Sequence, residues 1–288
     1  MRWTPMEISE DDAKAIQVAP NGEASWQRIQ ENMQHLTVER GVYSAQGNKV
    51  PGFLIKPKSK GPFPVVFFLR GGYKEFDAIR LYDLCFTLGN LAREGFAILT
   101  TQKQGGLGAE GKDTWGGDEH LADIENLLEA VRDDTSLQLD RLGIWAGSRG
   151  GVEAFRFVKK HPEAVQGVLT IGAPTDLRSL LDCRPDFRKV FQEAFNMKEE
   201  ELDARSIASW WRSFPQNVPV LCLHGSEDKR IPVKQAEILQ RISPRLVVQI
   251  VEGGNHPLFN WPERQETITR FFRRSLYNTV EQAGMNEI

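Results

Sequence analysis

Three side chains in this sequence have the chemistry of a nucleophile, an acid and a base. Ser148 stands in Trp-Ala-Gly-Ser-Arg-Gly-Gly, where an apolar run meets small residues and a helical pattern begins at once. A serine at such a strand-to-helix turn needs small neighbours and presents its hydroxyl at the C-terminal edge of a sheet. Because a serine hydroxyl is a weak nucleophile by itself, a base and a group that orients the base must lie elsewhere in the chain.

Asp228 and His256 follow Ser148 in the order nucleophile, acid, base. Asp228 lies in His-Gly-Ser-Glu-Asp, after the apolar run 218–223, and His256 lies in Glu-Gly-Gly-Asn-His, after the run 246–251. Short apolar runs of this kind are typical of buried strands. Since the carboxyl ends of parallel strands meet at one edge of a sheet, we expect the three side chains to lie together.

The acid has two competitors in the sequence. Glu227 is adjacent to Asp228, and Asp176 follows the preceding strand. A glycine upstream and a proline downstream constrain the loop of Asp228, which favours Asp228 as the residue that orients His256. His224, which precedes a tight glycine turn, is expected to hydrogen-bond the loop that carries Asp228.

Negative charge on a substrate oxygen would need backbone donors beside Ser148. The amide of Arg149, the next residue, lies at the start of a helix and can serve as one donor. A second donor is expected from the loop after the apolar run 63–69, where two glycines let the backbone approach a substrate. The candidates there are the amides of Gly72 and Tyr73 and the Tyr73 hydroxyl.

Strands and helices alternate regularly around these loops. Apolar runs predict strands at 37–45, 49–56, 63–69, 96–101, 141–147, 165–171, 218–223 and 246–251. Helical periodicity predicts helices over a leucine stripe at 81–91, over 118–132, from the Ser148 turn to 161, and over 233–242 and 263–276. This alternation predicts an α/β fold with a mostly parallel sheet and helices on both faces. The first two strands form a hairpin that supplies an antiparallel edge.

Two segments lie outside the alternation. Residues 1–36 form an N-terminal extension with one amphipathic helical segment around Ile29. Residues 174–217, before the penultimate strand, are helical in composition and form either a lid or a plain surface insertion. We therefore expect a catalytic domain over 37–288 that carries a helical insertion.

The composition excludes several classes of protein. The 288 residues carry 36 Lys and Arg against 39 Asp and Glu, a net charge of −3 that argues against nucleic-acid binding. No apolar run approaches the length of a membrane span, and no secretion signal opens the chain. Three cysteines without metal-like pairing argue against a disulfide framework or a metal site. We expect a cytoplasmic protein without nucleic-acid or membrane partners; the oligomeric state stays open.

The segment 106–111 matches the letters of a dinucleotide-binding fingerprint, Gly-x-Gly-x-x-Gly. That fingerprint has to open a helix, whereas Lys-Asp-Thr-Trp-Gly-Gly separates it here from the helix predicted at 118–132. We therefore expect no nucleotide site in this segment.

Together these motifs resemble the catalytic domain of the prolyl oligopeptidase family, within the α/β-hydrolase superfamily. The resemblance covers about residues 37–276 and is carried by Gly-Ser-Arg-Gly-Gly, by His-Gly-x-x-Asp with Ile-Pro, and by Trp-Gly before an acidic helix. It implies Ser148 as nucleophile, Asp228 as the orienting acid, and His256 as general base and then acid.

Two residues depart from the family's pattern. Arg70 stands where the family usually has His before the two glycines, and Arg149 replaces the common aromatic residue or His after the nucleophile. No strand-rich repeat precedes residue 37, so we expect a chain without the family's β-propeller. A site that is not gated by a second domain would suit an esterase as well as a peptidase.

The expected activity is a serine hydrolase that cleaves a small ester or a short peptide through an acyl-enzyme, without a metal or other cofactor. Arg70, Trp115 and Phe259 are candidate substrate-binding residues. Arg70, Arg149 and Arg178 suggest an anionic substrate group, although arginines near a site more often make structural ion pairs. The alternative is a non-catalytic ligand-binding protein of the same fold, which keeps the pocket and loses the chemistry.

Overall fold

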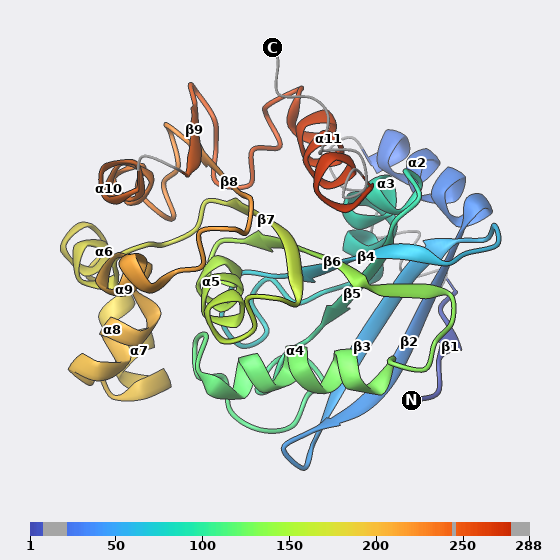
Figure 1. Ribbon diagram of the computed structural model, residues 1–288, viewed down its shortest axis with the longest axis horizontal. Coiled ribbons are helices and arrows are strands. Elements are labelled where there is room, and N and C mark those ends of the chain that lie inside the picture. Colours follow the sequence, from blue (N-terminus) through green and yellow to red (C-terminus); the bar gives the residue numbers. More distant parts are fainter. Residues whose placement is uncertain (8–21, 244–245, 278–288) are drawn as a thin grey trace.

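A single sheet organises the molecule (Figure 1). The computed structural model describes residues 1–7, 22–243 and 246–277. Within these residues nine strands pair in the order β1-β2-β3-β5-β4-β6-β7-β8-β9. Their bounds are β1 Thr4–Pro5, β2 Leu36–Ala45, β3 Asn48–Pro57, β4 Phe63–Leu69, β5 Ala97–Thr101, β6 Leu137–Gly147, β7 Val165–Ile171, β8 Val220–Gly225 and β9 Val247–Val251. The pairs β1-β2, β2-β3 and β3-β5 are antiparallel and the others parallel, which confirms the predicted mostly parallel sheet.

The predicted hairpin joins β2 and β3. Ala45 pairs with Asn48, so Gln46 and Gly47 form a two-residue turn, and both have positive φ, +51° and +86°. Two positive φ angles in such a loop indicate a type I′ turn, whose twist matches that of the flanking strands. The strand β1 has no counterpart in the sequence predictions, because two residues are too few to show a periodicity.

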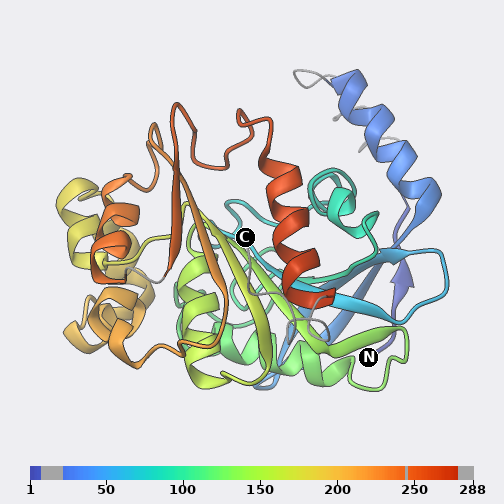
Figure 2. The ribbon, with the colours of Figure 1, turned by 45° about the horizontal axis from the view of Figure 1, so that its top comes forward.

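Helices cover both faces of the sheet (Figures 1 and 2). One face packs against α4 (Asp118–Ala130), α5 (Gly150–Lys160) and α10 (Lys234–Ile242). The opposite face packs against α2 (Gly22–His35), α3 (Gly89–Ala92) and α11 (Arg264–Tyr277). Each face has its own cluster of buried apolar side chains, for example Ile124 and Phe155 on the first and Leu88 and Phe272 on the second. Burial of these two clusters is the main term that stabilises the fold.

The helix with the leucine stripe differs from the expected regular α-helix. Its first part is a π-helix, η1 (Asp83–Leu88), which leads into α3. A π-turn shifts each hydrogen bond by one residue and alters which carbonyls find a partner within the helix. Asn32 of α2 donates from Nδ2 to the carbonyl of Cys85 at 2.6 Å. The side chain that meets this carbonyl comes from a distant helix, which local periodicity does not reveal.

Short helices stand between β7 and β8, at the position of the expected helical insertion. They are α6 (Leu177–Cys183), α7 (Phe187–Phe195), α8 (Glu199–Arg205), α9 (Ile207–Trp210) and the 3-10 turn η2 (Trp211–Ser213). The insertion lies at one end of the molecule beside α5 and α10 (Figures 1 and 2). Its apolar side chains pack on Trp115 from the loop before α4 and on Val152 of α5.

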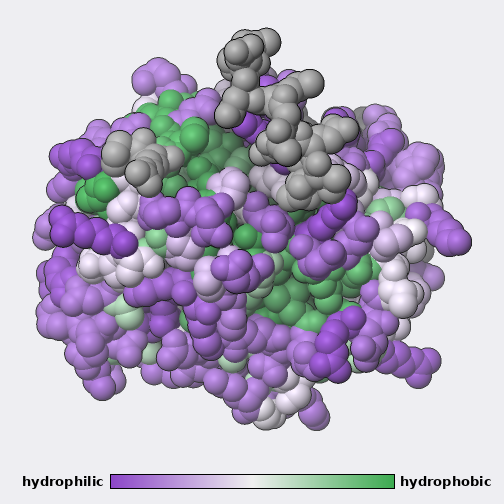
Figure 3. All heavy atoms as spheres, viewed as in Figure 1, coloured by the Kyte–Doolittle hydropathy of each residue, from purple (hydrophilic) through white to green (hydrophobic). Residues whose placement is uncertain are grey.

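The face of the molecule in Figure 3 is mostly hydrophilic, with smaller hydrophobic areas between the polar side chains. Within the described part of the chain, no helix combines the length and the apolar character that crossing a membrane requires.

Candidate active site

Ser148 sits at the sharp turn between β6 and α5. Its φ is +53°, in the left-handed region, and its amide donates to the carbonyl of Ile171 at 2.8 Å. A side chain at Gly150 would put its Cβ 2.1 Å from the carbonyl oxygen of Leu69. The small residue expected two positions after Ser148 is therefore required by the close approach of β4 to the turn.

Asp228 and His256 lie together at the carboxyl ends of β8 and β9. His256 Nδ1 is 2.6 Å from Asp228 Oδ2, and the Asp228 side chain is fully buried. Because a carboxylate only accepts hydrogen bonds, Nδ1 carries the proton toward Asp228 and Nε2 is left as an acceptor. The pair thus has the orientation that a general base requires.

Backbone amides hold the carboxylate of Asp228 in place. Oδ1 accepts from the amides of Arg230 and Ile231, both at 2.9 Å. His224 Nε2 contacts the Ile231 carbonyl at 2.8 Å, so the expected contact between His224 and the Asp228 loop is confirmed. Burial lowers the pKa of His224. The His224 imidazole therefore acts as a neutral donor to this carbonyl.

The two other candidate acids, Asp176 and Glu227, form no hydrogen bond with His256 in the described part of the chain. Asp176 caps α6, where its carboxylate accepts the amide of Ser179 at 3.0 Å. Glu227 is exposed and has no hydrogen bond to His256. Asp228 is therefore the acid that the fold brings to His256.

Ser148 and His256 line one cavity of about 250 Å³. Among the described residues, neither Ser148 Oγ nor His256 Nε2 has a hydrogen-bond partner. Hydrogen bonds between a nucleophile and its base are often long without substrate and tighten in the Michaelis complex. Because Ser148 and His256 line one cavity, a single molecule in it could contact both groups.

Free amides lie on two sides of Ser148. The amides of Gly72, Tyr73 and Arg149 have no acceptor among the described residues. The Tyr73 hydroxyl, the remaining candidate donor, is buried and has no hydrogen-bond partner among the described residues, and Tyr73 packs against the cluster formed by the insertion. Burial raises the pKa of Tyr73 to about 12, with the carboxylates of Glu193 and Asp113 adding to the effect. The backbone amides are therefore the better donors for an oxyanion.

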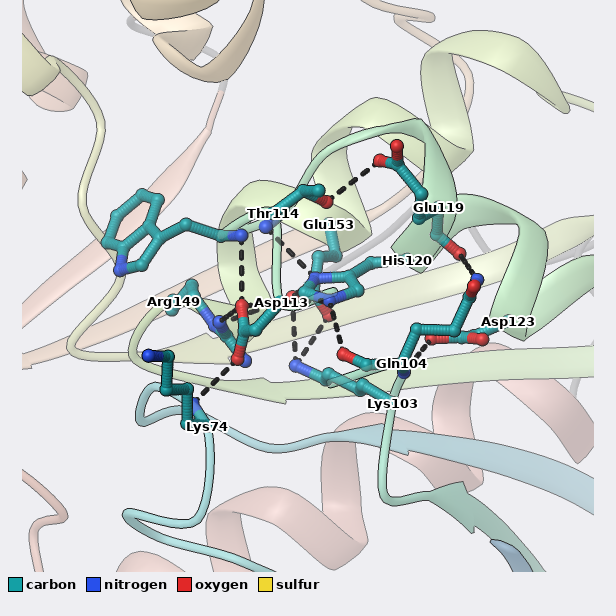
Figure 4. Close-up of polar contacts among 12 residues, drawn as sticks. Lys74, Lys103, Gln104, Asp113, Thr114, Glu119, His120, Asp123, Arg149 and Glu153 are labelled. Carbon is teal, nitrogen blue, oxygen red and sulfur yellow. Dashed lines mark hydrogen bonds and ion pairs between the residues drawn. The ribbon is translucent and has the colours of Figure 1, made fainter. Parts of the chain in front are cut away.

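The side chain of Arg149 points into a buried polar network, not into the cavity (Figure 4). Its Nη1 donates to Asp113 Oδ1, which also accepts the amide of Trp115 at 3.0 Å. Asp113 Oδ2 accepts the amide of Lys74 at 2.7 Å. One carboxylate therefore ties the Ser148 turn to the loop that carries Gly72 and Tyr73.

A second carboxylate completes the network (Figure 4). Glu153 of α5 lies 2.6 Å from Lys103 Nζ, and that ammonium also donates to the carbonyl of Arg70 at 2.6 Å. Burial opposes the charge on Glu153, but Lys103, His120 and Arg149 hold its pKa well below the usual range. The carboxylate is therefore ionised and anchors the strand end at Arg70.

The three predicted substrate-binding residues differ in whether their side chains are available to a substrate. Arg70 is 2% exposed, and within the described residues its guanidinium donates only to backbone carbonyls, those of Gly71, Lys74, Phe76 and Gln102. Trp115 packs edge-on against Phe191 at 4.7 Å and does not line the cavity with Ser148. Phe259 is 62% exposed and does line it.

The arginines that suggested an anionic substrate are engaged within the protein. Arg70 holds carbonyls, Arg149 pairs with Asp113, and Arg178 pairs on the surface with Glu199 and Asp203. These three side chains have the structural roles that arginines near a site more often take.

Gly172, at the end of β7, is a site residue that the sequence analysis missed. Its φ is +61°, and a Cβ there would lie 2.9 Å from His256 Nδ1 and 3.1 Å from Asp228 Oδ2. The side chains of His256 and Asp228 therefore pack directly against the backbone of Gly172. The available signal was a glycine directly after the strand predicted at 165–171.

No group of three or more His, Cys, Asp or Glu side chains within the described ranges could hold a metal ion. The segment 106–111 lies in a loop, and α4 begins only at Asp118. The match to a dinucleotide fingerprint therefore lacks the helix that such a site needs.

Comparisons of sequence identify the family of the chain. The sequence model of the prolyl oligopeptidase family matches residues 88–279, more than half of the chain. The chain is 22% identical over 211 residues to the uncharacterized peptidase YtmA of Bacillus subtilis, covering 72% of this chain and 79% of that protein.

Comparisons of structure give the fold. An acylaminoacyl peptidase of Pyrococcus horikoshii matches with a TM-score of 0.72 at 18% identity, over 92% of this chain and 45% of that chain. An esterase of Pyrococcus furiosus matches with a TM-score of 0.64 at 16% identity, over 85% and 93%. The chain spans less than half the length of the acylaminoacyl peptidase. The expected α/β-hydrolase fold is confirmed.

Proposed function

Because this chain belongs to the prolyl oligopeptidase family of serine hydrolases, we propose that Ser148, Asp228 and His256 are its catalytic residues. The observation that carries the proposal is the 2.6 Å contact between His256 Nδ1 and Asp228 Oδ2, beside the cavity that Ser148 and His256 share. The three residues are far apart in the sequence, and their order along the chain is nucleophile, acid and base.

The proposed reaction has two acyl-transfer steps. Ser148 Oγ attacks an ester or amide carbonyl while His256 Nε2 takes its proton and then gives it to the leaving group. Asp228 keeps the imidazole oriented and stabilises its charged form. Water, activated by His256, then adds to the acyl-enzyme and releases Ser148.

The oxyanion would be held by backbone amides. The amide of Arg149 supplies one donor, and the amide of Gly72 or Tyr73 supplies the second. Donors that are fixed before the reaction contribute more than donors that must reorganise. The contact of Asp113 with both segments supports this assignment.

We assign residues 37–288 to the catalytic domain and residues 1–36 to an extension of it. The insertion at 174–217 contacts two loops of the proposed site. Glu193 pairs with Lys74, in the loop of Gly72 and Tyr73, and Arg184 donates to the carbonyls of Lys229 and Arg230, in the loop of Asp228. These contacts support a role in positioning the two loops, and none of the described residues of the insertion lines the cavity of Ser148 and His256. The cavity of about 250 Å³ suits a small ester or the end of a short peptide.

Replacement of the nucleophile tests the proposal. Ser148→Ala should lower kcat on p-nitrophenyl esters or aminoacyl anilides by several powers of ten, on the order of 10⁴-fold or more. The same change should abolish labelling by a fluorophosphonate probe, and His256→Ala should slow labelling strongly. Ser213→Ala, a change in the exposed turn η2, is the control and should keep both activities.

Wild-type turnover by a folded Ser148→Ala protein would overturn the assignment. An intact wild-type protein that neither turns over substrate nor reacts with the probe would favour the alternative, a ligand-binding protein of the same fold. The profile across ester and anilide substrates then decides between esterase and peptidase.

A further inference from the structure

Arg264 is an arginine of the candidate active site that the proposed mechanism does not use. It begins α11 and lines the same cavity as Ser148 and His256. Its guanidinium carbon lies 4.8 Å from the ring centre of Phe259 and 5.4 Å from that of Trp145. Both aromatic residues also line the cavity, so the guanidinium lies in its wall.

The hydrogen-bonding capacity of Arg264 is mostly unused. Nε donates to the carbonyl of Pro257 at 2.9 Å, whereas Nη1 and Nη2 have no partner among the described residues. A guanidinium has five N–H donors in a planar fork. Nε is the nitrogen attached to the side-chain stem. The outer edge of the guanidinium, formed by Nη1 and Nη2, therefore stays available to a ligand.

No carboxylate of the described chain balances this charge. Asp77 and Asp83 line the same cavity, but within the described residues neither forms an ion pair with Arg264, and Asp83 accepts the amide of Arg80 at 2.9 Å. Burial alone lowers the pKa of Arg264, to about 10. The side chain is therefore still charged at neutral pH.

A purely structural role explains only part of this arrangement. The bond from Nε to the Pro257 carbonyl steadies the loop next to His256, and the two rings attract the cation. Neither contact needs an uncompensated charge with two free nitrogens in the wall of a cavity. Even partial burial of a cation without a carboxylate costs stability, and such groups cluster at functional sites.

The other residues that line the cavity indicate what kind of substrate portion would fit between Ser148 and Arg264. The apolar part of the lining is formed by Phe68, Ile79, Trp145 and Ile171, and the charged residues Asp77, Asp83 and Arg230 also line the cavity. A ligand that reaches from Ser148 to Arg264 would therefore carry a short apolar portion that ends in an anion.

We propose that Arg264 recognises a carboxylate of the substrate, held by the outer edge of its guanidinium while Ser148 attacks the scissile carbonyl. The inference rests on the proposed function and adds the substrate class, a carboxylate-bearing ester or peptide. A planar guanidinium matches the two oxygens of a carboxylate, whereas an ammonium acts as a point charge. The carboxylate could stand on the acyl group or on the leaving group.

Two matched substrate pairs distinguish these sources. Mono-p-nitrophenyl adipate against p-nitrophenyl hexanoate tests an acyl carboxylate. Acetyl-Ala-Ala against acetyl-Ala-Ala-amide tests a carboxylate on the leaving group. The wild-type enzyme should prefer the charged member of one pair, and Arg264→Gln should reduce the charged-to-neutral ratio of kcat/KM about 10- to 100-fold.

Controls separate recognition from a structural effect. Arg264→Lys should keep part of the preference, because it keeps the charge without the fork. Arg270→Gln, an exposed position on the same helix, should leave the ratio unchanged. Loss of the Pro257 contact alone would lower kcat/KM for both members of a pair alike.

Equal losses on charged and neutral substrates in Arg264→Gln would overturn the proposal. So would a wild-type enzyme that reacts with the fluorophosphonate probe but prefers neither carboxylate-bearing member. If the probe does not label Ser148 in the wild-type enzyme, that result contradicts the proposed function instead. The two failures are therefore distinguishable.

Discussion

At the scale of single residues, the candidate site depends on a backbone position without a side chain. The imidazole of His256 and the carboxylate of Asp228 both lie against Gly172, whose φ of +61° and missing Cβ leave them room. The short contact between the pair would be lost if either ring or carboxylate moved.

Gly172→Ala should therefore impair catalysis more than folding. The Cβ would lie 2.9 Å from His256 Nδ1, and the left-handed backbone adds a strain of about 1–2 kcal/mol. We expect kcat/KM to fall on the order of 10²-fold, since small displacements of a catalytic group have effects of that size. Steady-state kinetics on an ester substrate measures the loss.

Gly253→Ala is the matched control for this change. Gly253 lies in the His256 loop with a φ of +68°, and a Cβ there meets nothing within 4 Å. It introduces the same backbone strain without a contact to His256. Similar losses of kcat/KM in the two variants would assign the effect to strain alone and contradict the steric explanation.

At the scale of elements, the loop between β5 and α4 connects the two halves of the proposed oxyanion site. Asp113 in this loop accepts from Arg149 on one side and from the Lys74 amide on the other. The loop has no secondary structure of its own, yet its carboxylate is buried at the point where two catalytic segments meet.

Asp113→Asn should loosen both segments at once. An amide has one acceptor oxygen and no charge, so it cannot serve Arg149, Trp115 and Lys74 together. We expect kcat to fall about 10- to 100-fold with a smaller change in KM, because the affected donors act in the transition state. Loss of a buried ion pair should also lower the free energy of unfolding by about 3–5 kcal/mol.

Asp123→Asn is the control for a buried carboxylate outside the site. Asp123 of α4 is fully buried and accepts the amide of Gln104 at 2.8 Å, without contact to Arg149 or Lys74. A variant that is destabilised but keeps the wild-type kcat is expected there. A wild-type kcat in folded Asp113→Asn would show that the bridge does not position the donors.

At the scale of the whole molecule, the pH dependence of stability should carry a contribution from Asp83. Burial raises the pKa of this carboxyl group to about 6, from 3.8. Between these values the folded state binds more protons than the unfolded state, so stability falls as pH rises through the interval. The loss of stability is complete above pH 6 and absent below the pKa of the unfolded state, 3.8.

Asp83→Asn removes this titration. Asparagine can still accept the Arg80 amide, so the variant should gain about 1–2 kcal/mol over the wild type at pH 8. The gain should shrink toward zero as the pH falls to 4. Urea unfolding across this range measures it, with Asp182→Asn at an exposed position of α6 as the control. A gain that does not change with pH would contradict the assignment.

The sequence by itself determined the order of the elements and the chemistry at the strand ends. Apolar runs are short and regular because parallel strands are buried on both faces, and small residues surround Ser148 because β4 passes close to it. Such local requirements leave a trace in the residue types, so the sheet and the three candidate catalytic residues could be predicted.

The tertiary structure alone decided which polar side chains meet. Arg70 and Trp115 looked like substrate-binding residues, yet one holds carbonyls and the other packs under the insertion, whereas Arg264 faces the cavity. Asp113 reaches Arg149 across 36 positions of sequence. Contacts between distant segments depend on how the layers pack, and no local pattern records that packing.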